Sequence, residues 1–201
     1  MKIIGLTGSI GMGKSVAASL FRRLGVAVYD SDAAVHTLLS PNGKAFERVA
    51  LTFPECWNAK THQIDRRKLG KIVFSDLRQK EKLEAILHPL VRHSQIEFVR
   101  KGRRMGLKHL ALDIPLLFET KAERNFCSVV CVTAPFLIQK IRVLRRAGMT
   151  LQKFYTILDL QLPDAEKRRG ANQVIQTGLG YRHTLRALKK YLRKLEKNKN
   201  A

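Results

Sequence analysis

A glycine-rich stretch directly after the first apolar segment constrains this chain more than any other feature. Residues 8–15 read G-S-I-G-M-G-K-S, which fits the pattern G-x-x-x-x-G-K-S. They follow a predicted strand and open a predicted helix, and this is the context in which the pattern forms a phosphate-binding loop. Glycines allow the positive-φ backbone and the close approach that such a loop needs. An ordinary strand-to-helix turn is the alternative, and the full eight-residue match argues against it.

The loop predicts how the triphosphate of a nucleotide would be bound. Its backbone N–H groups would surround the phosphates, and the helix that begins at Lys14 would direct the positive end of its dipole toward them. The Lys14 ammonium would reach the β- and γ-phosphates, and the Ser15 hydroxyl would be a ligand of Mg²⁺. The residues expected to bind ATP are Gly11, Met12, Gly13, Lys14, Ser15 and Val16, with Arg146 from a later helix. The pattern does not say which reaction follows.

Length and composition place the chain among globular α/β proteins. With 201 residues and 45% hydrophobic residues, it can form one domain with insertions. No apolar run approaches the roughly 18 residues of a membrane span, and residues 1–6 lead into the loop without a separate signal segment. We therefore expect a cytoplasmic protein that does not bind membranes. Cys56, Cys127 and Cys131 do not form a disulfide framework, and we interpret the last two as buried strand residues.

The net charge of +22 is extreme for a chain of this size. Binding of nucleic acid or of an anionic membrane is one interpretation, and attraction of anionic small substrates or a basic proteome is the other. Residues 182–199 contain eight Lys or Arg and one Glu. Leu185, Leu188, Tyr191, Leu192 and Leu195 recur there at helical spacing, which is typical of a packed helix with a solvated basic face. Because no nucleic-acid-binding module accompanies it, we do not expect nucleic acid as a partner.

Short apolar segments alternate with helical segments along most of the chain. The predicted strands are Ile3–Thr7, Ala27–Tyr29, Leu110–Ile114, Cys127–Val132 and, as a weaker signal, Gln173–Gln176. The predicted helices are Lys14–Leu24, Ala33–Leu39, Lys44–Thr52, Arg66–Phe74, Asp76–Leu87, Pro89–Gly102, Phe136–Arg146, Leu151–Leu160 and Tyr181–Lys197, with a helix break at His88-Pro89. This alternation predicts a doubly wound parallel sheet. The helical stretch at about residues 40–106 is too long for one crossover, so we expect a subdomain at the carboxyl edge of the sheet.

Acidic residues follow two of the predicted strands, at the edge where ligands collect in open α/β sheets. Asp30 and Asp32 come after the second strand, where one carboxylate could act as general base for a hydroxyl group. The alternative for Asp32 is an N-cap of the helix predicted from Ala33, and the sequence leaves both open. Asp113 ends the third strand, as does the magnesium-binding aspartate of phosphate-loop enzymes, and Glu119 follows near the expected cleft mouth.

Basic residues cluster on the helix predicted at residues 136–146. Arg142, Arg145 and Arg146 share one face by their i, i+3 and i+4 spacing. Guanidinium groups present a fixed fork of donors that suits phosphate, and they stabilise the charge of a phosphoryl group in transfer. A lid that carries them would also exclude water from the reaction. The alternative is an exposed basic helix face.

Together these segments resemble the dephospho-CoA kinase family. The similar segments are Thr7–Ser15, Asp30–Asp32, residues 64–66 (I-D-R), residues 86–89 (I-L-H-P), Asp113–Glu119 (D-I-P-L-L-F-E), Gln139 with Arg142 and Arg146, Gln161, and residues 171–175 (A-N-Q-V-I). The resemblance covers residues 3 to about 178. It implies one P-loop NTPase-type α/β domain over residues 1–201. The expected core is 1–39, 107–135 and 170–201, with a helical substrate-binding insertion at 40–106 and a lid at 136–169.

The resemblance also implies an activity, the ATP-dependent phosphorylation of the ribose 3′-hydroxyl of dephospho-CoA in the last step of CoA biosynthesis. It implies catalytic roles for Asp32, Lys14 and Arg142, and it makes Ser15 and Asp113 the Mg²⁺-binding residues. The residues that it places at the acceptor are Asp32, Asp65, Arg66, His88 and Glu119. The partners are then the small molecules ATP and dephospho-CoA, and we expect a monomer. Another small-molecule or nucleotide kinase is one alternative, and an ATP-switched nucleic-acid-binding protein is the alternative from a different class.

The chain departs from the family pattern at several positions. These are Ser9 in place of Gly, Met12 in place of Ser, Val16 in place of Thr, Asn172 in place of Asp, and Gln176 in place of Asp or Asn. Lys14 and Ser15 are unchanged, so we expect nucleotide binding to survive. Asn172 and Gln176 are expected near the adenine, where they would alter the contacts with the base.

Overall fold

The computed structural model describes residues 1–197, which fall into two compact units. The first unit contains residues 1–29 and the chain from residue 102 onward, and the second contains Asp30–Lys101. The sequence-based division begins the insertion ten residues later, at residue 40. Lys199, which is one of the eight basic residues in residues 182–199, lies outside the described residues.

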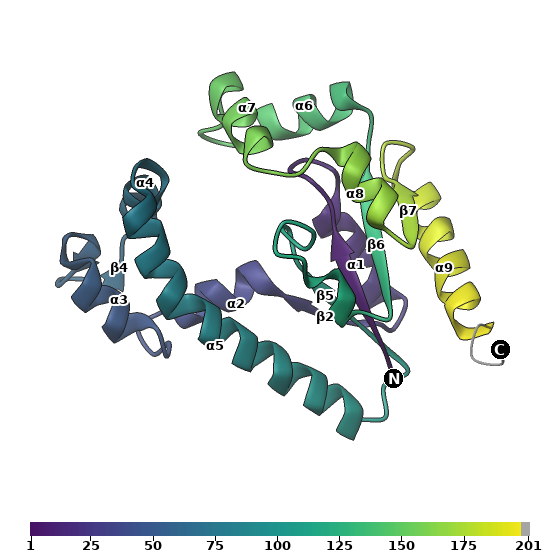
Figure 1. Ribbon diagram of the computed structural model, residues 1–201, viewed down its shortest axis with the longest axis horizontal. Coiled ribbons are helices and arrows are strands. Elements are labelled where there is room, and N and C mark those ends of the chain that lie inside the picture. The colour runs from purple at the N-terminus through teal and green to yellow at the C-terminus, as the bar shows by residue number, and fades with distance from the viewer. Residues whose placement is uncertain (198–201) are drawn as a thin grey trace. The chain divides into compact units, whose positions relative to one another are not determined.

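The first unit is built on a parallel sheet. Its strands are β1 (Lys2–Thr7), β2 (Ala27–Asp30), β5 (His109–Asp113), β6 (Ser128–Thr133) and β7 (Gln173–Gln176), in the order β2-β5-β1-β6-β7 (Figure 1). β1 pairs in parallel with β5 and β6, and β6 pairs in parallel with β7. The predicted doubly wound sheet is therefore confirmed, because parallel neighbours that are not consecutive in the chain require crossovers.

The strand register brings three strand ends to one edge. Leu6, near the end of β1, lies opposite Asp113 at the end of β5 and opposite Val130 in β6. The glycine-rich stretch leaves the sheet one residue further on, at Thr7. Side chains that follow β1, β5 and β6 are thus gathered at the edge where ligands bind in sheets of this kind.

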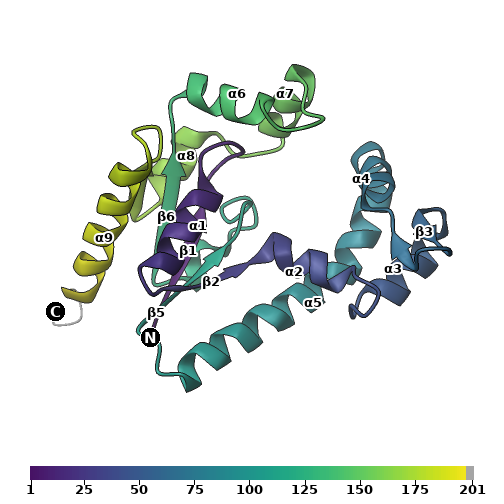
Figure 2. The same ribbon diagram turned by 180° about the vertical axis from the view of Figure 1, so that it is seen from behind.

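Helices α1 (Lys14–Arg23), α8 (Asp164–Gly170) and α9 (Tyr181–Lys197) contact the strands of this sheet. The unit also contains η2 (Ala122–Asn125), α6 (Phe136–Leu144) and α7 (Leu151–Asp159). α1 packs against α9, and the core beneath them contains Ile4, Leu6, Leu20, Phe21 and Leu188, all fully buried. α8 contacts β6, and Figures 1 and 2 show it on the face opposite α1. The sequence did not predict α8, because its seven residues (D-A-E-K-R-R-G) carry no apolar period.

The second unit is mostly helical and has its own core. Its elements are α2 (Ser31–Leu38), α3 (Phe46–Thr52), η1 (Pro54–Cys56), β3 (Trp57–Asn58), β4 (Gln63–Ile64), α4 (Arg66–Ser75) and most of α5 (Leu77–Arg104). Val49, Phe53, Cys56 and Leu69 are among the buried residues of its core. The antiparallel hairpin β3–β4 was not predicted, because two-residue strands are too short to show an alternating pattern.

The predicted helix break at His88-Pro89 is wrong. α5 is one helix from Leu77 to Arg104 and contains Pro89 in its interior. A proline there cannot donate the backbone hydrogen bond of its turn, which weakens the helix locally. Packing offsets this loss, because Ile86 and Leu87 before the proline and Leu90 and Val91 after it contact the same core.

Two expectations about side-chain exposure have different outcomes. The tail helix is confirmed as a packed helix, since α9 buries Leu188 and Tyr191 and forms part of the core. The expected burial of both strand cysteines is wrong for Cys127, which is exposed and precedes the first residue of β6, whereas Cys131 is buried within the strand. In residues 1–197, no helix combines the length and the apolar character that crossing a membrane requires.

Candidate active site

The backbone of residues 8–15 explains why glycines occur there. Gly11 and Gly13 have φ values of 75° and 87°, which side chains rarely allow. A Cβ on Gly11 would lie 2.6 Å from a methyl carbon of Val143, and one on Gly13 would lie 2.7 Å from the Thr177 hydroxyl oxygen. The loop therefore lies so close to Val143 and Thr177 that a residue with a Cβ does not fit at Gly11 or Gly13.

The loop ends at the amino terminus of α1, which suits an anion. Its N-cap residue, Gly13, makes no side-chain capping bond, and the first turn of the helix contains no acidic residue. Lys14 is the first residue of the helix, and Ser15 and Val16 follow with exposed side chains. The first N–H groups of a helix have no partner within it, and the helix dipole favours negative charge at this end.

Lys14 and Asp113 are brought together at the sheet edge, as the sequence expects of two residues at one phosphate site. The Lys14 ammonium nitrogen lies 2.6 Å from Asp113 Oδ1. The Lys14 side chain is 16% exposed and that of Asp113 is 4% exposed, so the pair is largely shielded from water. A charge pair in this setting interacts more strongly than one in water.

The oxygen donors near the loop fit Mg²⁺. Ser15 offers an exposed hydroxyl at the start of α1, and Asp113 offers a carboxylate at the end of β5. Among residues 1–197 there is no cluster of three or more His, Cys, Asp or Glu that could hold a metal ion alone. Mg²⁺ commonly takes one or two protein ligands and fills its octahedron with water and substrate phosphates.

Arg142 binds the loop and the segment after β7. Its Nη1 donates to the Thr177 hydroxyl at 2.9 Å and to the Gly11 carbonyl at 3.4 Å, and its Nη2 donates to the Thr177 carbonyl at 3.0 Å. The Thr177 hydroxyl in turn donates to the Met12 carbonyl at 2.7 Å. Arg142 and Thr177 thus hold the outside of the loop, and nothing in the local sequence around Thr177 predicts this contact.

The helix predicted to extend to Arg146 ends two residues earlier. α6 ends at Leu144, so Arg145 caps the helix and Arg146 lies beyond it, both with exposed side chains. A tight turn with Gly148 at a φ of 74° then leads into α7, which starts at Leu151. Only Arg142 of the three is bonded to the loop.

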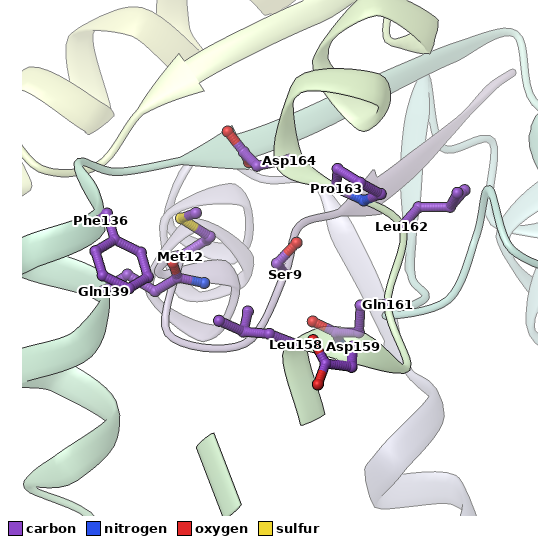
Figure 3. A pocket seen from close by; sticks show the side chains of 10 residues that line it. All are labelled: Ser9, Met12, Phe136, Gln139, Leu158, Asp159, Gln161, Leu162, Pro163 and Asp164. Atoms are coloured by element: carbon purple, nitrogen blue, oxygen red, sulfur yellow. The ribbon is translucent and has the colours of Figure 1, made fainter. Parts of the chain in front are cut away.

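Two glutamines also contact the loop. Gln139, in α6, and Gln161, between α7 and α8, approach it from different elements (Figure 3). The Gln139 side-chain amide donates to the Ile10 carbonyl at 2.8 Å, and the Ile10 N–H donates to the Gln161 side-chain oxygen at 3.0 Å. A pocket of about 490 Å³ lies beside the loop here. It is lined by Ser9, Met12, Phe136, Gln139, Leu158, Asp159, Gln161, Leu162, Pro163 and Asp164.

Glu119 lies in a buried ion pair. Its Oε1 is 2.7 Å from the ammonium of Lys167, whose side chain is fully buried, and the same oxygen accepts from the Leu162 N–H at 3.0 Å. The Lys167 ammonium also lies 3.4 Å from the Pro115 carbonyl. The pair therefore ties the segment after β5 to α8. The sequence did not predict the buried ion pair of Lys167, because this residue is one of several charged residues in a row.

In the second unit, Asp30 is the N-cap residue of α2. The interpretation of Asp32 as an N-cap is therefore wrong. The Asp30 carboxylate accepts from the Ala33 N–H at 2.9 Å, and α2 begins at Ser31. Asp32 lies in the first turn with an exposed side chain. Within the part of the chain that the structure describes, its carboxylate has no hydrogen-bond or ion-pair partner, which leaves it free to bind a ligand.

The other predicted acceptor residues of the second unit are all exposed. Asp65 caps α4, with its carboxylate accepting from Arg67 N–H at 2.9 Å and Lys68 N–H at 3.0 Å. These bonds, that from Lys68 above all, hold the pKa of Asp65 below its usual value. Arg66 is hydrogen-bonded to the His36 ring, and His88 is exposed on α5. A basic group next to an exposed imidazole suits an anionic ligand.

The motif order and this geometry match a known family of kinases. The family model described as dephospho-CoA kinase matches residues 2–180. The chain belongs to the dephospho-CoA kinase family.

This chain is similar to individual dephospho-CoA kinases and to solved structures over nearly its whole length. The dephospho-CoA kinase of Rhodospirillum rubrum is 50% identical over 190 residues, which cover 93% of this chain and 88% of that protein. A crystal structure from Thermus thermophilus is 35% identical with a TM-score of 0.83, covering 96% of this chain and 97% of that one. The dephospho-CoA kinase of Campylobacter jejuni is 26% identical with a TM-score of 0.71, covering 98% of both chains.

The departures from the dephospho-CoA kinase pattern have distinct places in the fold. Met12 is buried, and its sulfur accepts from the Ala134 N–H at 3.1 Å, so it joins the loop to the end of β6. Asn172 accepts from the Val129 N–H at 2.7 Å, before the start of β7. This position is at the edge of the sheet opposite the loop. Gln176 ends β7 and lines a pocket of about 340 Å³ together with Met12.

Proposed function

We propose that this chain transfers the γ-phosphoryl group of ATP to the ribose 3′-hydroxyl of dephospho-CoA, giving CoA and ADP. One observation carries the donor half of this proposal: the loop presents Lys14 next to Asp113 at the start of a helix with free N–H groups. Membership of the dephospho-CoA kinase family supports the acceptor half. We place the reaction in the cytoplasm, with both substrates as free small molecules and the protein as a monomer.

The donor site is proposed to act through the loop and Lys14. The loop N–H groups and the Lys14 ammonium would bind the β- and γ-phosphates and fix the direction in which the leaving oxygen points. Ser15 and Asp113 would hold Mg²⁺, Asp113 by way of water. When bound, Mg²⁺ supplies charge neutralisation at the β- and γ-phosphate oxygens. The shielding of the Lys14–Asp113 pair increases these electrostatic effects.

The acceptor is proposed to be activated by Asp32. Its carboxylate would accept the proton of the 3′-hydroxyl as that oxygen bonds to the γ-phosphorus, while the bond from phosphorus to the β-phosphate oxygen breaks and ADP leaves. Its exposed carboxylate, which has no hydrogen-bond or ion-pair partner in residues 1–197, supports this role. Asp65, Arg66, His88 and Glu119 remain the proposed acceptor-binding residues. For Glu119, the ion pair with Lys167 favours an indirect contribution.

Two arginines are proposed to stabilise the phosphoryl group in transfer. Arg142 is the first candidate and Arg146 the second. The contacts of Arg142 with Gly11 and Thr177 show that it also braces the loop, so its replacement is expected to affect binding of ATP as well as turnover. The exposed side chain of Arg146, beyond the end of α6, supports its place as the second candidate.

A coupled ADP-release assay with different acceptors tests the proposal. We expect ATP-dependent ADP release with dephospho-CoA, and little release with nucleoside monophosphates or shikimate. Phosphorylation is then located by digestion of the product, which should carry the new phosphate on the ribose 3′-oxygen. Faster turnover of one of the other acceptors would assign the chain to a different small-molecule kinase activity.

A further inference from the structure

We propose that Gln139 and Gln161 are positioning residues for the phosphoryl donor, which act together on the backbone of Ile10. This inference rests on the proposed function of the loop as the ATP site. Gln139 donates to the Ile10 carbonyl at 2.8 Å, and Gln161 accepts from the Ile10 N–H at 3.0 Å. Both polar backbone groups of one loop residue are thus held by side chains from a distant part of the chain.

The direction of each hydrogen bond is fixed by the backbone. A carbonyl can only accept and an N–H can only donate, so Gln139 must present its NH₂ group and Gln161 its oxygen. Gln139 is 3% exposed, which leaves water little access to replace its bond. A buried polar group that loses its partner costs more free energy than the bond itself contributes.

The location of Ile10 gives these two bonds a specific effect. Ile10 immediately precedes Gly11, and the positive-φ residues Gly11 and Gly13 determine where the following N–H groups point. Glycines give the loop many accessible conformations, so a loop that binds phosphate must be restrained by contacts. The two glutamines supply such contacts at the residue before the turn.

Gly11 packs closely against Val143, and Met12 is buried, but packing does not restrain Ile10 on the side of the two glutamines. The space beside the loop at Gln139 and Gln161 is a pocket of about 490 Å³ rather than a filled core (Figure 3). The amide groups therefore bridge an open region between the loop and the segment at residues 136–169. α6 and the α7–α8 connection are joined to each other through Ile10, so a movement of either element changes the loop.

The opposite polarity of the two bonds allows a matched test. Gln139→Glu and Gln161→Glu make the same change in charge with almost no change in volume. At Gln139 the carboxylate loses the donor and faces a carbonyl oxygen, whereas at Gln161 it keeps an acceptor for the N–H. Gln139→Met and Gln161→Met remove the polar group at each position.

We measure the Kd of ATP by calorimetry without an acceptor, together with steady-state constants and thermal midpoints. Gln139→Glu and both Met variants are expected to weaken ATP binding about tenfold, equivalent to about 1.4 kcal/mol. Gln161→Glu is expected to retain the affinity to within about threefold, as the conservative variant. The KM of dephospho-CoA should not change. In Gln139→Glu, ATP affinity should improve as the pH falls, because a protonated carboxyl group again donates to the carbonyl.

Several results would overturn the inference. Equal losses in the two Glu variants would mean that the added charge, and not the hydrogen bond, determines ATP affinity. Wild-type ATP affinity in both Met variants would show that the bonds do not position the loop. A lower thermal midpoint with unchanged ATP affinity would make the residues structural only. Because ATP binding is measured without an acceptor, these results do not depend on whether dephospho-CoA is the substrate.

Discussion

The ammonium nitrogen of Lys14 lies 2.6 Å from Oδ1 of Asp113, which joins the amino end of α1 to the carboxyl end of β5. The parallel register of β1 and β5 produces this contact, because it sets Leu6 opposite Asp113 just before the loop. Both side chains are largely shielded from water, at 16% and 4% exposure. The ion pair therefore stabilises the fold, and we propose that its two members also bind the phosphates and Mg²⁺.

Lys14→Met should affect both catalysis and the stability of the fold, and the two effects can be measured separately. Loss of the cation at the phosphates is expected to lower kcat by at least about 10²–10³-fold. Asp113 would lose one charged partner in a shielded site, which should lower the free energy of unfolding by about 1–3 kcal/mol. Urea unfolding and the ADP-release assay measure the two effects independently.

The double variant Lys14→Met with Asp113→Asn is the control for the stability effect. A neutral amide at residue 113 no longer requires the cation, so part of the lost stability should return, with a coupling of about 0.5–3 kcal/mol. Activity should stay low. A normal kcat in Lys14→Met would refute the role of the lysine at the phosphates.

Asp32→Asn tests the proposed general base against a matched neighbour. Without a carboxylate to accept the hydroxyl proton, kcat should fall about 10²–10⁴-fold while the KM of ATP changes little. Asp30→Asn is the control, because asparagine caps a helix as well as aspartate does and should keep kcat within about threefold. If Asp32→Asn raises only the KM of dephospho-CoA, Asp32 binds the acceptor and does not take its proton.

The sheet and the loop were predictable from the sequence because their signals are local. β1, β5 and β6 are short and apolar, and the loop follows β1 within one residue. The eight-residue pattern identified Lys14 and Ser15 without any tertiary information. The capping of α2 was harder, because Asp30 and Asp32 are both good caps and a shift of the helix start by two residues decides between them.

The contacts that brace the loop were not predictable in the same way. Gln161 meets Ile10 across 151 positions of the chain, and Thr177 meets Met12 across 165. Gln161 is part of the resemblance to the dephospho-CoA kinase family, but its spacing does not indicate which group it contacts, and Thr177 belongs to none of the similar segments. Lys167 likewise lies in a run of charges that is typical of an exposed helix, and its burial depends on where Glu119 lies in the folded chain. The contacts of such residues can be recognised only in the folded chain, where the sheet brings distant segments together.

Lys167→Met should destabilise the protein more than most single changes. It leaves the Glu119 carboxylate in a shielded site without its cation, and such losses typically cost about 3–5 kcal/mol. Lys167→Met combined with Glu119→Gln should recover part of this, since the amide oxygen can still accept from the Leu162 N–H. Chemical unfolding of the single and double variants measures both values.

The same variants test whether Glu119 contacts the acceptor. Steady-state constants of Glu119→Gln are measured well below its thermal midpoint, so that unfolding does not contribute. If the role of Glu119 is to hold α8 through Lys167, the KM of dephospho-CoA should stay within about threefold of the wild-type value. A much larger rise in this KM alone would assign Glu119 to the acceptor site.

Asp65 gives a prediction about pH. The backbone N–H groups of Lys68 and Arg67 lower the pKa of Asp65, so its carboxylate is stabilised in the folded protein. This contribution is complete above the usual aspartate pKa and is lost as the pH falls through the lowered value. Asp65→Asn keeps the cap but removes this titration, so the difference in urea midpoint between variant and wild type should change below about pH 4. A difference that is constant with pH would contradict the capping role.

The three cysteines should differ in reactivity, and this tests the placement of β6. Burial raises the pKa of Cys131 to about 12, and burial together with Glu55 raises the pKa of Cys56. A raised pKa leaves less thiolate at pH 8, so these two thiols should react slowly with an aromatic disulfide reagent, whereas the exposed Cys127 should react quickly.

Stopped-flow absorbance of the native protein should then show one fast thiol, and all three should react in guanidinium chloride. Cys127→Ser is expected to abolish the fast phase without changing kcat, because Cys127 precedes β6 at the edge opposite the phosphate-binding loop. Persistence of the fast phase in this variant would mean that Cys131 or Cys56 is accessible. If the reacting thiol is Cys131, the burial of β6 is wrong.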